Sequence, residues 1–498
     1  MQNVIPMNSN SNKAGIVYLV GAGPGHPGLI TRMGYELLRH CDAVAYDALI
    51  PLELVASLPE RVERHYVGRR AGRHSMPQAD KNRLLLELAR RGLNVVRLKG
   101  GDTSFFGGSA EEAEYLAAAG IRVIVVPGVT AASAVAAASG LPLTDRRAAS
   151  WAFFATGHGS ADEPIPVPWK EIAALHGGTM VIYMGLANLE QTVAQILAGG
   201  HDGNTPCMVV QAAMTGVQRI LDSRLNDVVA DCRLNQIKPP ALVIVGRVVQ
   251  HRTPPAGHST QISGKRILVT CCAQETEGIC ATLRDRGAEP IPYPTCTIEN
   301  NDDAEGWERF VKIAASGGWC IFASELEVIG FIDALLRNSL DLRCLGNMKI
   351  AAIGSGAASA LLSRGIQADI AFASPKYSLS LQDLSRGKES RSAHLVIASN
   401  EMAIDRKEWM EVVRLKLFRA KPAAWEPHWL QEITNNPPDF ILFNHPAAVD
   451  GLVQMLGEEV VQDLTTKCKF VSTNEAAAAE ARRRGLPISP EFSDYFCI

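Results

Sequence analysis

Short runs of β-branched and aromatic residues alternate with amphipathic stretches from Gly15 to about Val249. Alternation of this kind is typical of α/β architecture, because the runs have the length of buried strands and the stretches have helical periodicity. The runs predict strands at 16–20, 43–47, 94–98, 122–126, 151–156, 179–183, 207–211 and 241–245. The segment 250–263 contains Pro254-Pro255 and has no periodicity, which predicts a linker.

A second α/β unit begins at Lys265 and contains an internal repeat. The apolar run 318–324 leads into a helix, a second run at 349–354 and an alanine-rich helix. The run 439–445 leads in the same way to 469–472 and another alanine-rich helix. A repeated unit predicts two similar lobes, and we expect a ligand in the cleft between them.

The predicted domains follow from these patterns. We expect a disordered tail at 1–14, a first domain at 15–249, a linker at 250–263 and a second domain at 264–498. The segments 290–299 and 417–423 have the character of extended connectors between the two lobes of the second domain. Its lobe one is therefore predicted at 264–297 plus 420–498, and its lobe two at 298–419.

Composition narrows the possible partners. The 498 residues include 49 basic and 52 acidic ones, a net charge of −3, so no general positive field attracts nucleic acid or a membrane. An anionic ligand must therefore meet a local basic cluster. The 11 cysteines form no CxxC pair and show no metal-ligand spacing, so we expect reduced, mostly buried thiols and no metal. No apolar run approaches the roughly 18 residues of a membrane span, and we expect a cytoplasmic protein.

The segment 17–25 is a β-branched run that breaks into a glycine loop. A strand followed by clustered glycines lets a ligand approach the main chain, since glycine has no Cβ. Dinucleotide sites use such a loop, but the third glycine of that motif falls on His26 here, and Pro24 stiffens the turn. Asp47, at the end of the second strand, still suits a ribose-binding carboxylate. A dehydrogenase is therefore one alternative.

Four more turns marked by glycine or proline follow predicted strands, at 97–102, 126–131, 183–186 and 238–242. Each alone is typical of an ordinary turn. Together with 66–74 and 141–144, their order and spacing resemble the tetrapyrrole methylase family, and within it the uroporphyrinogen-III C-methyltransferases. The resemblance covers about residues 15–250 and implies a two-lobed α/β fold.

The resemblance implies that S-adenosylmethionine lies folded in a trough between the two lobes of this domain. A sulfonium ligand needs backbone carbonyls and close apolar walls that exclude water. The cofactor-binding residues implied by the family are Pro24, Gly100, Gly101, Asp102, Phe105, Thr130, Ala131, Met184 and Ala213. Ala241 is a further suitable wall residue. Asp102 has two possible roles, as an acceptor for the ribose or amino group and as a cap of the following helix.

The implied substrate is a polycarboxylated, electron-rich macrocycle, uroporphyrinogen III, which is methylated on carbon to precorrin-2. Carbon methylation leaves an extra proton, and by resemblance Asp47 is the general base, although a turn acid is its alternative role. Arg69, Arg70, Arg73 and His74, with Arg146 and Arg147, would bind the carboxylates. Arg69, the second candidate catalytic residue, stands where the family has lysine; it supplies charge but no transferable proton.

The second half, about 264–498, resembles the uroporphyrinogen-III synthases, which close a linear tetrapyrrole while inverting one ring. Cys271-Cys272 replaces the usual Arg-Pro, and Phe418 stands in the place of a tyrosine. Phenylalanine has no hydroxyl to relay a proton. We therefore expect this half either to make uroporphyrinogen III from hydroxymethylbilane or to bind uroporphyrinogen III. A non-catalytic tetrapyrrole- or nucleotide-binding scaffold is the other hypothesis. The methylase family commonly forms homodimers, which we expect here too.

Overall fold

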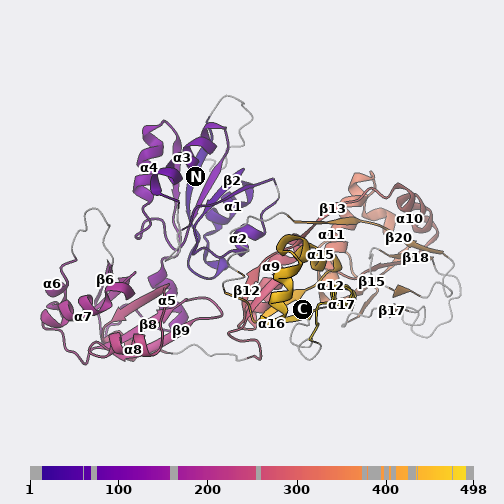
Figure 1. Cartoon of the computed structure of the whole chain (residues 1–498). Coiled ribbons are helices and arrows are strands. Elements are labelled where there is room, and N and C mark those ends of the chain that lie inside the picture. Colours follow the sequence, from indigo (N-terminus) through magenta and orange to yellow (C-terminus); the bar gives the residue numbers. More distant parts are fainter. Residues whose placement is uncertain are drawn as a thin grey trace. The chain divides into compact units, whose positions relative to one another are not determined.

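The computed structural model describes residues 14–59, 61–68, 76–157, 167–253, 260–372, 378–379, 394–397, 403–404, 411–423, 433, 436–473 and 475–489. The chain divides into two compact units, Met1–Ile267 with Cys280–Pro292, and Leu268–Ile279 with Tyr293–Ile498 (Figure 1). The domain limits expected from the sequence stay a prediction. Among the described helices, none has the length and apolar character needed to cross a membrane.

The first sheet consists of five parallel strands in the order β3-β2-β4-β1-β5. Its strands are β1 Ile16–Gly21, β2 Ala43–Tyr46, β3 Glu63–Tyr66, β4 Val95–Lys99 and β5 Arg122–Val126. The three central strands β1, β2 and β4 are buried at every position, as a parallel sheet with helices on both faces requires. The four predicted strands here are confirmed to within one residue. β3 was missed because Glu, Arg and His occupy three of its four positions.

Helices connect and cover this sheet. They are η1 Pro27–Leu29, α1 Arg32–His40, α2 Glu53–Ala56, α3 Gln78–Arg90 and α4 Ser109–Ala118, whereas α5 Ala131–Ser139, which follows β5, packs against the second sheet. The sheet and helices together enclose a core that includes Leu19, Leu85 and Leu116. Parallel strands place all their carboxyl ends on one edge of the sheet, so the loops after β1, β2, β4 and β5 lie along the same edge.

The second sheet is mixed, in the order β6-β7-β10-β8-β9. Its strands are β6 Trp151–Thr156, β7 Gly178–Tyr183, β8 Pro206–Gln211, β9 Arg219–Arg224 and β10 Ala241–Val245. β6 and β7 are parallel, whereas the other neighbours are antiparallel. β9 was not predicted, because it is an exposed edge strand without a continuous apolar run. The helices here are α6 Trp169–Ala173, η2 Leu186–Asn188, α7 Leu189–Ala198, α8 Val228–Leu234 and η3 Arg247–His251.

The C-terminal half has one sheet for each predicted lobe, in the orders β12-β11-β22-β23 and β16-β15-β14-β18-β20. The strands of the first are β11 Arg266–Thr270, β12 Glu289–Pro292, β22 Phe440–Phe443 and β23 Lys469–Ser472. Those of the second are β14 Gly318–Phe322, β15 Met348–Ile353, β16 Ile370–Phe372, β18 His394–Ile397 and β20 Glu411–Arg414. A short pair, β17 Ser378–Leu379 and β19 Ala403–Ile404, is also parallel.

The predicted repeat is confirmed in the strand pairing. β14 and β15 are parallel with a helix between them, and so are β22 and β23. The helices of this half are η4 Ala273–Glu275, α9 Thr276–Asp285, α10 Ala304–Ser316, α11 Glu325–Arg337, η5 Leu342–Leu345, α12 Gly354–Leu362, α15 Pro446–Leu456, α16 Glu458–Lys467 and α17 Glu475–Arg483. The two predicted connectors contain β13 Cys296–Asn300 and β21 Phe418–Pro422, which pair with each other antiparallel.

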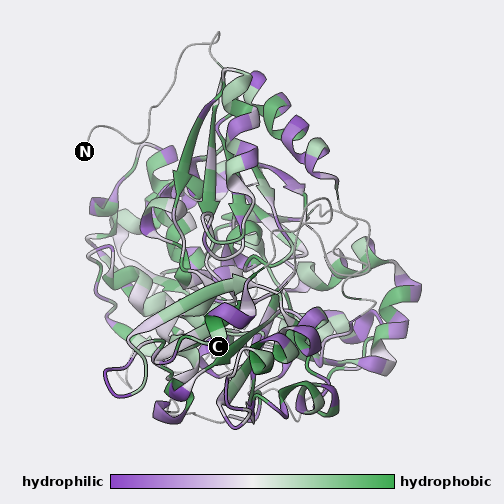
Figure 2. Ribbon diagram, turned by 90° about the vertical axis from the view of Figure 1, so that its left-hand side faces the viewer, coloured by the Kyte–Doolittle hydropathy of each residue, from purple (hydrophilic) through white to green (hydrophobic). Residues whose placement is uncertain are grey.

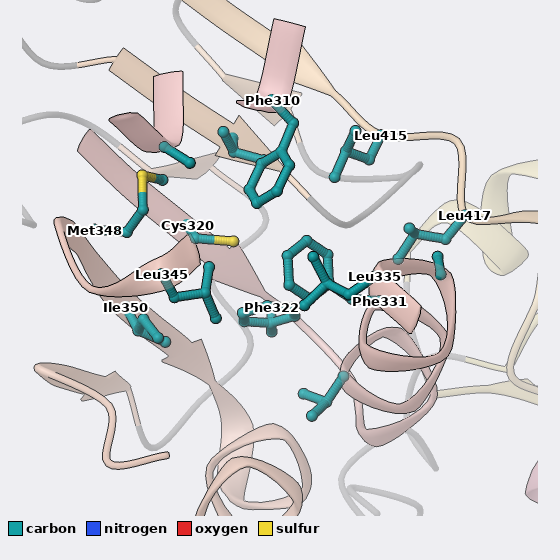
Figure 3. Close-up of a cluster of buried hydrophobic side chains, with 14 of the residues drawn as sticks. Phe310, Cys320, Phe322, Phe331, Leu335, Leu345, Met348, Ile350, Leu415 and Leu417 are labelled. Carbon is teal, nitrogen blue, oxygen red and sulfur yellow. The ribbon is translucent and has the colours of Figure 1, made fainter. Parts of the chain in front are cut away.

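Hydropathy follows the layers of the fold. In Figure 2 the strands are mostly green, and many helices carry alternating green and purple bands, as amphipathic helices do. An aromatic cluster fills the core beside α11 (Figure 3). The Phe331 ring lies 5.5 Å from Trp307, 5.4 Å from Phe310 and 5.2 Å from Phe322, between centroids. Aromatic contacts at these separations add to the free energy gained from burial.

We predict that Phe331→Ala destabilises this part of the chain by about 3–5 kcal/mol, because it leaves a cavity among three rings. Hydrogen exchange of peptides from α11 and β14, followed by mass spectrometry, measures the loss. Leu336→Ala, on the same helix but 64% exposed, is the control and is expected to change protection little. A Phe331→Ala protein with native protection in both peptides would contradict the packing described here.

Candidate active site

The glycine loop after β1 lies against the loops that follow β4 and β5. Gly23 and Gly101 exchange two backbone hydrogen bonds, each 3.1 Å long, and the Ala22 N–H donates to the Lys99 carbonyl at 2.8 Å. A methyl group added to Gly128 would lie 2.4 Å from the Gly101 oxygen, and one added to Gly21 would lie 2.7 Å from Gly128. Glycine is required because three backbones are in contact. The sequence-predicted turns at 21–25, 100–102 and 127–128 therefore converge.

Asp102 ties two of these loops together. Its carboxylate oxygens accept one hydrogen bond from the Ser104 N–H at 2.8 Å and one from the Gly128 N–H at 2.7 Å. The residue is 8% exposed. Hydrogen bonds from backbone N–H groups to a carboxylate are among the stronger ones, so Asp102 stabilises the junction itself. Its predicted contact with a ligand stays a prediction, but each oxygen keeps a further lone pair for it.

The second sheet contributes to the same place through Tyr183, the last residue of β7. Its hydroxyl is 2.7 Å from the Thr130 Oγ1 and accepts a hydrogen bond from the Ala132 N–H at 3.0 Å. Burial raises the pKa of the Tyr183 hydroxyl, which keeps it protonated. Met184 follows directly and is 54% exposed. Tyr183, which the sequence analysis did not single out, thus brings Met184 to the N-terminus of α5, where Thr130 and Ala131 lie.

The segment around Ala213 reaches the glycine loop from the other side. A methyl group added to Gly25 would lie 2.3 Å from the Ala213 carbonyl oxygen, so Pro24 and Ala213 belong to neighbouring turns. The Ala212 N–H donates to the Pro240 carbonyl at 2.9 Å, and Ala241 pairs with Gln211 across β10 and β8. The structure therefore brings Ala213 and Ala241 together with Pro24.

Exposed apolar side chains border these loops. Phe105 and Phe106 are 40% and 44% exposed; Phe106 contacts the Tyr183 ring at 4.9 Å and Phe105 the Phe154 ring at 5.8 Å, between centroids. Neighbouring exposed apolar groups indicate a binding surface. Four of the six non-glycine residues with positive φ in the described chain also lie in these loops: Phe106, Met184, Ala212 and Met214. Left-handed backbone at such residues concentrates at ligand sites.

Asp47, the predicted base, lies at the end of β2 and is one-quarter exposed. The Arg97 Nη2 donates to its Oδ1 at 2.7 Å, and the Asp47 N–H donates to the Leu98 carbonyl at 3.2 Å. On its other side the Arg97 Nε donates to the Glu112 Oε1 at 3.2 Å. The Lys99 Nζ donates to the Glu112 Oε2 at 2.6 Å. Asp47 is therefore the outermost member of a chain of four charged groups.

The inner three groups of this network are almost inaccessible: the side chains of Arg97, Glu112 and Lys99 are 2%, 1% and 5% exposed. Burial raises the pKa of the Glu112 carboxyl, but Arg97 and Lys99 more than offset it and the pKa lies below its ordinary value. Burial lowers the pKa of Lys99, and Arg97 adds to that. The sequence analysis missed this network. Its signal was two basic residues, Arg97 and Lys99, within the otherwise apolar strand β4.

The basic residues expected to bind the substrate carboxylates come from two segments, 69–74 and 146–147, and the structure describes only the second. Arg69, Arg70, Arg73 and His74 lie outside the described residues, so their predicted roles stay predictions. Arg147 forms a bidentate pair with Asp145, with Nε to Oδ1 and Nη2 to Oδ2 both at 2.8 Å. We expected Arg147 to be available to an anionic ligand, whereas its guanidinium is already held by a carboxylate. Arg146, next to it, is exposed.

One cysteine cluster was not visible in the sequence spacing. Cys272, Cys296 and His445 bring their ligand atoms within 4.8 Å of one another, and the two sulfurs are 3.0 Å apart. The His445 Nδ1 accepts a hydrogen bond from the Ala447 N–H at 3.0 Å and so caps α15. This hydrogen bond assigns Nδ1 of His445 to the helix end. The ten described cysteines are free thiols and nine are buried, as predicted.

We predict that Glu112→Gln lowers the free energy of unfolding at pH 7 by about 3–5 kcal/mol, because two buried cations lose a facing charge. The lowered pKa of Glu112 stabilises the native state above the ordinary value of 4.5, and this is lost as pH falls through the native pKa. The difference between native protein and variant therefore shrinks in acid. Urea unfolding between pH 7 and pH 3 measures it; a constant difference would contradict the network.

Two family models match the chain. That of the tetrapyrrole (corrin/porphyrin) methylases covers residues 16–229, and that of uroporphyrinogen-III synthase HemD covers 278–493. The structure of uroporphyrin-III C-methyl transferase from Thermus thermophilus, complexed with S-adenyl homocysteine, is 38% identical. The match covers 48% of this chain and 100% of the Thermus thermophilus chain, with a TM-score of 0.41.

Curated relatives match one or both halves. The siroheme synthase of Gluconacetobacter diazotrophicus is 43% identical over 249 residues, 50% of this chain and 53% of that protein, so the chain spans about half its length. The uroporphyrinogen-III C-methyltransferase of Bacillus subtilis is 35% identical over 71% of this chain and 72% of its own. The porphyrin biosynthesis protein HemD of Ruminiclostridium josui is 30% identical over 93% of both. The resemblance drawn from the sequence is confirmed: the chain belongs to the tetrapyrrole methylases, S-adenosylmethionine-dependent methyltransferases, and carries a second half of the uroporphyrinogen-III synthase type.

Proposed function

We propose that this chain methylates uroporphyrinogen III on carbon to give precorrin-2. The observation that carries the proposal is the convergence of four turns, near Pro24, Asp102, Thr130 and Met184, which the sequence places far apart. Had these turns lain on separate surfaces, no common cofactor site could exist. A nicotinamide-dependent dehydrogenase is not supported, because the chain belongs to the methylases and His26 stands where the dinucleotide motif has its third glycine.

The residues at the junction fit S-adenosylmethionine. A methyl group added to Gly101 would meet only the Ala131 nitrogen, at 4.0 Å, so the main chain there faces open space. Asp102 offers carboxylate oxygens, the start of α5 offers backbone N–H groups, and Phe105 and Met184 offer apolar surface. We assign the cofactor to these groups together with Pro24, Gly100, Ala213 and Ala241. When bound, it supplies a methyl group on a positively charged sulfur.

Asp47 is the proposed proton acceptor. Its Oδ1 is held by Arg97, and we assign Oδ2 to receive the proton that leaves the methylated carbon. A carboxylate that is one-quarter exposed can face a large ligand and still be fixed from behind. We propose that the loop 69–74, with Arg69 in place of the family's lysine, binds the substrate carboxylates as a charge clamp.

We predict that Asp47→Asn lowers kcat by about 10²- to 10⁴-fold, the range for loss of a general base. The Kd for S-adenosylhomocysteine, measured by calorimetry, is expected to change less than threefold, because Asp47 is not among the residues assigned to the cofactor. Turnover is followed under anaerobic conditions as transfer of labelled methyl groups to uroporphyrinogen III. Asp42→Asn, in the preceding turn, is the control. Normal turnover in Asp47→Asn would remove this residue from the mechanism.

For the second half we propose that it makes or binds uroporphyrinogen III, and Phe418 favours binding. The Phe418 ring packs against the lobe-two core, and its Cζ is 2.1 Å from the position of a methyl group added to Gly330 on α11. The para carbon, where a tyrosine carries its hydroxyl, therefore faces a helix backbone and not a ligand. The position is used for packing, which supports the scaffold hypothesis for this half.

We predict that Phe418→Tyr destabilises this half by about 1–3 kcal/mol, because the added oxygen has to displace α11. Incubation with hydroxymethylbilane and labelled methyl donor, followed by separation of the ring-inverted and non-inverted products, reports on both halves at once. We expect Phe418→Tyr to yield no more inverted product than the native chain. A gain of inverted product at unchanged stability would show that the position serves chemistry.

Two further proposals concern the context of the chain. We propose a homodimer, as is common in this family, and light scattering of the purified chain at several concentrations tests it. We also propose a cytoplasmic location, in keeping with the named relatives, which are bacterial biosynthetic enzymes.

A further inference from the structure

The strongest feature not used by the assigned chemistry is the buried charge network behind Asp47. Arg97 and Lys99 are two positions apart on β4, so their side chains leave the same face of the sheet. Both point to Glu112 on α4, and Arg97 also reaches Asp47 at the end of the neighbouring strand β2. The Gln78 Nε2 donates to the Glu112 Oε1 at 3.2 Å as well. Three elements thus bring two cations and two carboxylates together.

Every part of the Arg97 guanidinium is engaged. Nη2 donates to Asp47 at 2.7 Å, Nε donates to Glu112 at 3.2 Å, and Nη1 donates to the Leu98 carbonyl at 3.1 Å and the Ala45 carbonyl at 3.4 Å. Its side chain is 2% exposed. A planar group held at all three nitrogens cannot rotate, so the atom that it presents to Asp47 has one position.

We propose that Arg97, supported by Glu112 and Lys99, is the positioning residue that orients the Asp47 carboxylate as proton acceptor in methyl transfer. This inference rests on the function proposed above for Asp47. Arg97 itself is fully covered and touches no ligand, so it acts only through Asp47. Glu112 has the complementary role: without it, Arg97 and Lys99 would be two buried cations facing the single carboxylate of Asp47, which leaves excess positive charge in a dry interior.

The charges around Arg97 support this assignment. Burial by itself lowers the pKa of Arg97, and the facing carboxylates of Asp47 and Glu112 more than offset this, so the pKa lies above its ordinary value. The guanidinium is therefore a permanent charge at every working pH. Of the described titratable groups, Lys99 on β4 also acts electrostatically on Asp47, and Glu112 on α4 reaches it through Arg97.

The network is also continuous with the cofactor loop. Lys99 is the last residue of β4, its carbonyl accepts the Ala22 N–H, and Gly100, Gly101 and Asp102 follow it directly. The strand that holds Arg97 against Asp47 therefore also sets the start of the loop assigned to the methyl donor. Acceptor and donor sites share one rigid element, which is what catalysis by fixed orientation requires.

Two variants of Arg97 separate charge from geometry. Arg97→Met removes both, so the Asp47 carboxylate is no longer fixed from behind. We expect kcat at pH 7 to fall about 10- to 100-fold and KM for uroporphyrinogen III to change less than threefold. Arg97→Lys keeps the charge but has a single nitrogen for two carboxylates. Its kcat is expected to fall as well, with KM again unchanged within threefold.

Controls exclude loss of stability as the cause. Leu88→Ala, in the core of the same lobe, destabilises the fold without removing a charge, and Arg91→Gln removes an exposed guanidinium that pairs with Glu63. Neither is expected to lower kcat by more than threefold or to change KM for uroporphyrinogen III. Each variant is used only if its circular dichroism spectrum and its Kd for S-adenosylhomocysteine match those of the native chain. If Arg97→Met does not meet this criterion, the kcat of Arg97→Lys tests the proposal.

The outcomes are distinguishable. A native kcat in folded Arg97→Met, with Asp47→Asn inactive, would overturn the positioning role alone. A native kcat in Arg97→Lys would overturn the requirement for two-sided contact. Full turnover in Asp47→Asn would overturn the proposed function of Asp47, and the role of Arg97 with it. A similar fall of kcat at unchanged KM in Leu88→Ala would show that stability, not orientation, controls turnover.

Discussion

Close contact of three main chains at one sheet edge is the constraint on which the first half of this protein depends. Gly21 ends β1, and Gly101 and Gly128 lie two residues after the neighbouring parallel strands β4 and β5. A Cβ at Gly21 or Gly128 would lie 2.7 Å or 2.4 Å from a neighbouring backbone. With that contact in place, Asp102 can bridge two loops with short hydrogen bonds, and the start of α5 can reach Tyr183 from the second sheet. A methyl donor has to be held in one orientation, and the cofactor site proposed above is built mostly on this fixed backbone.

Charged side chains are arranged differently in β4 and in the loop that follows it. Along β4, Arg97 and Lys99 are buried with carboxylates that balance them, whereas the loop after it offers mostly backbone and apolar groups. Because charges in a dry interior are costly unless paired, the balance explains why the network contains two of each sign. Only Asp47, at its end, is exposed enough to meet a substrate. The network thus delivers one oriented carboxylate at the surface from charges that are themselves inaccessible.

The second half combines a repeated architecture with close packing at Phe418. Phe418 fills a space that exists because residue 330 on α11 is glycine, and the ring joins the aromatic core of lobe two. The same half has two repeated lobes and their paired connectors. Function resides in sites placed on folds, so the activity of this half depends on the residues at such positions and not on the lobes alone.

From the sequence alone, the strands with continuous apolar runs, the two-lobed repeat and the family were all predictable, because each leaves a local or ordered signal. β3 and β9 were not, since Glu63–Tyr66 and Arg219–Arg224 read as polar segments whose pairing comes from neighbouring strands. Arg97, Lys99 and Glu112 were also missed, because opposite charges 13 to 15 residues apart meet only when a strand and a helix pack together. The sequence by itself identified the glycine- and proline-marked turns that the structure brings together. Tertiary structure alone decided that their backbones touch, that Arg147 is already paired and that Asp47 is held from behind, since each depends on distances between segments that are remote along the chain.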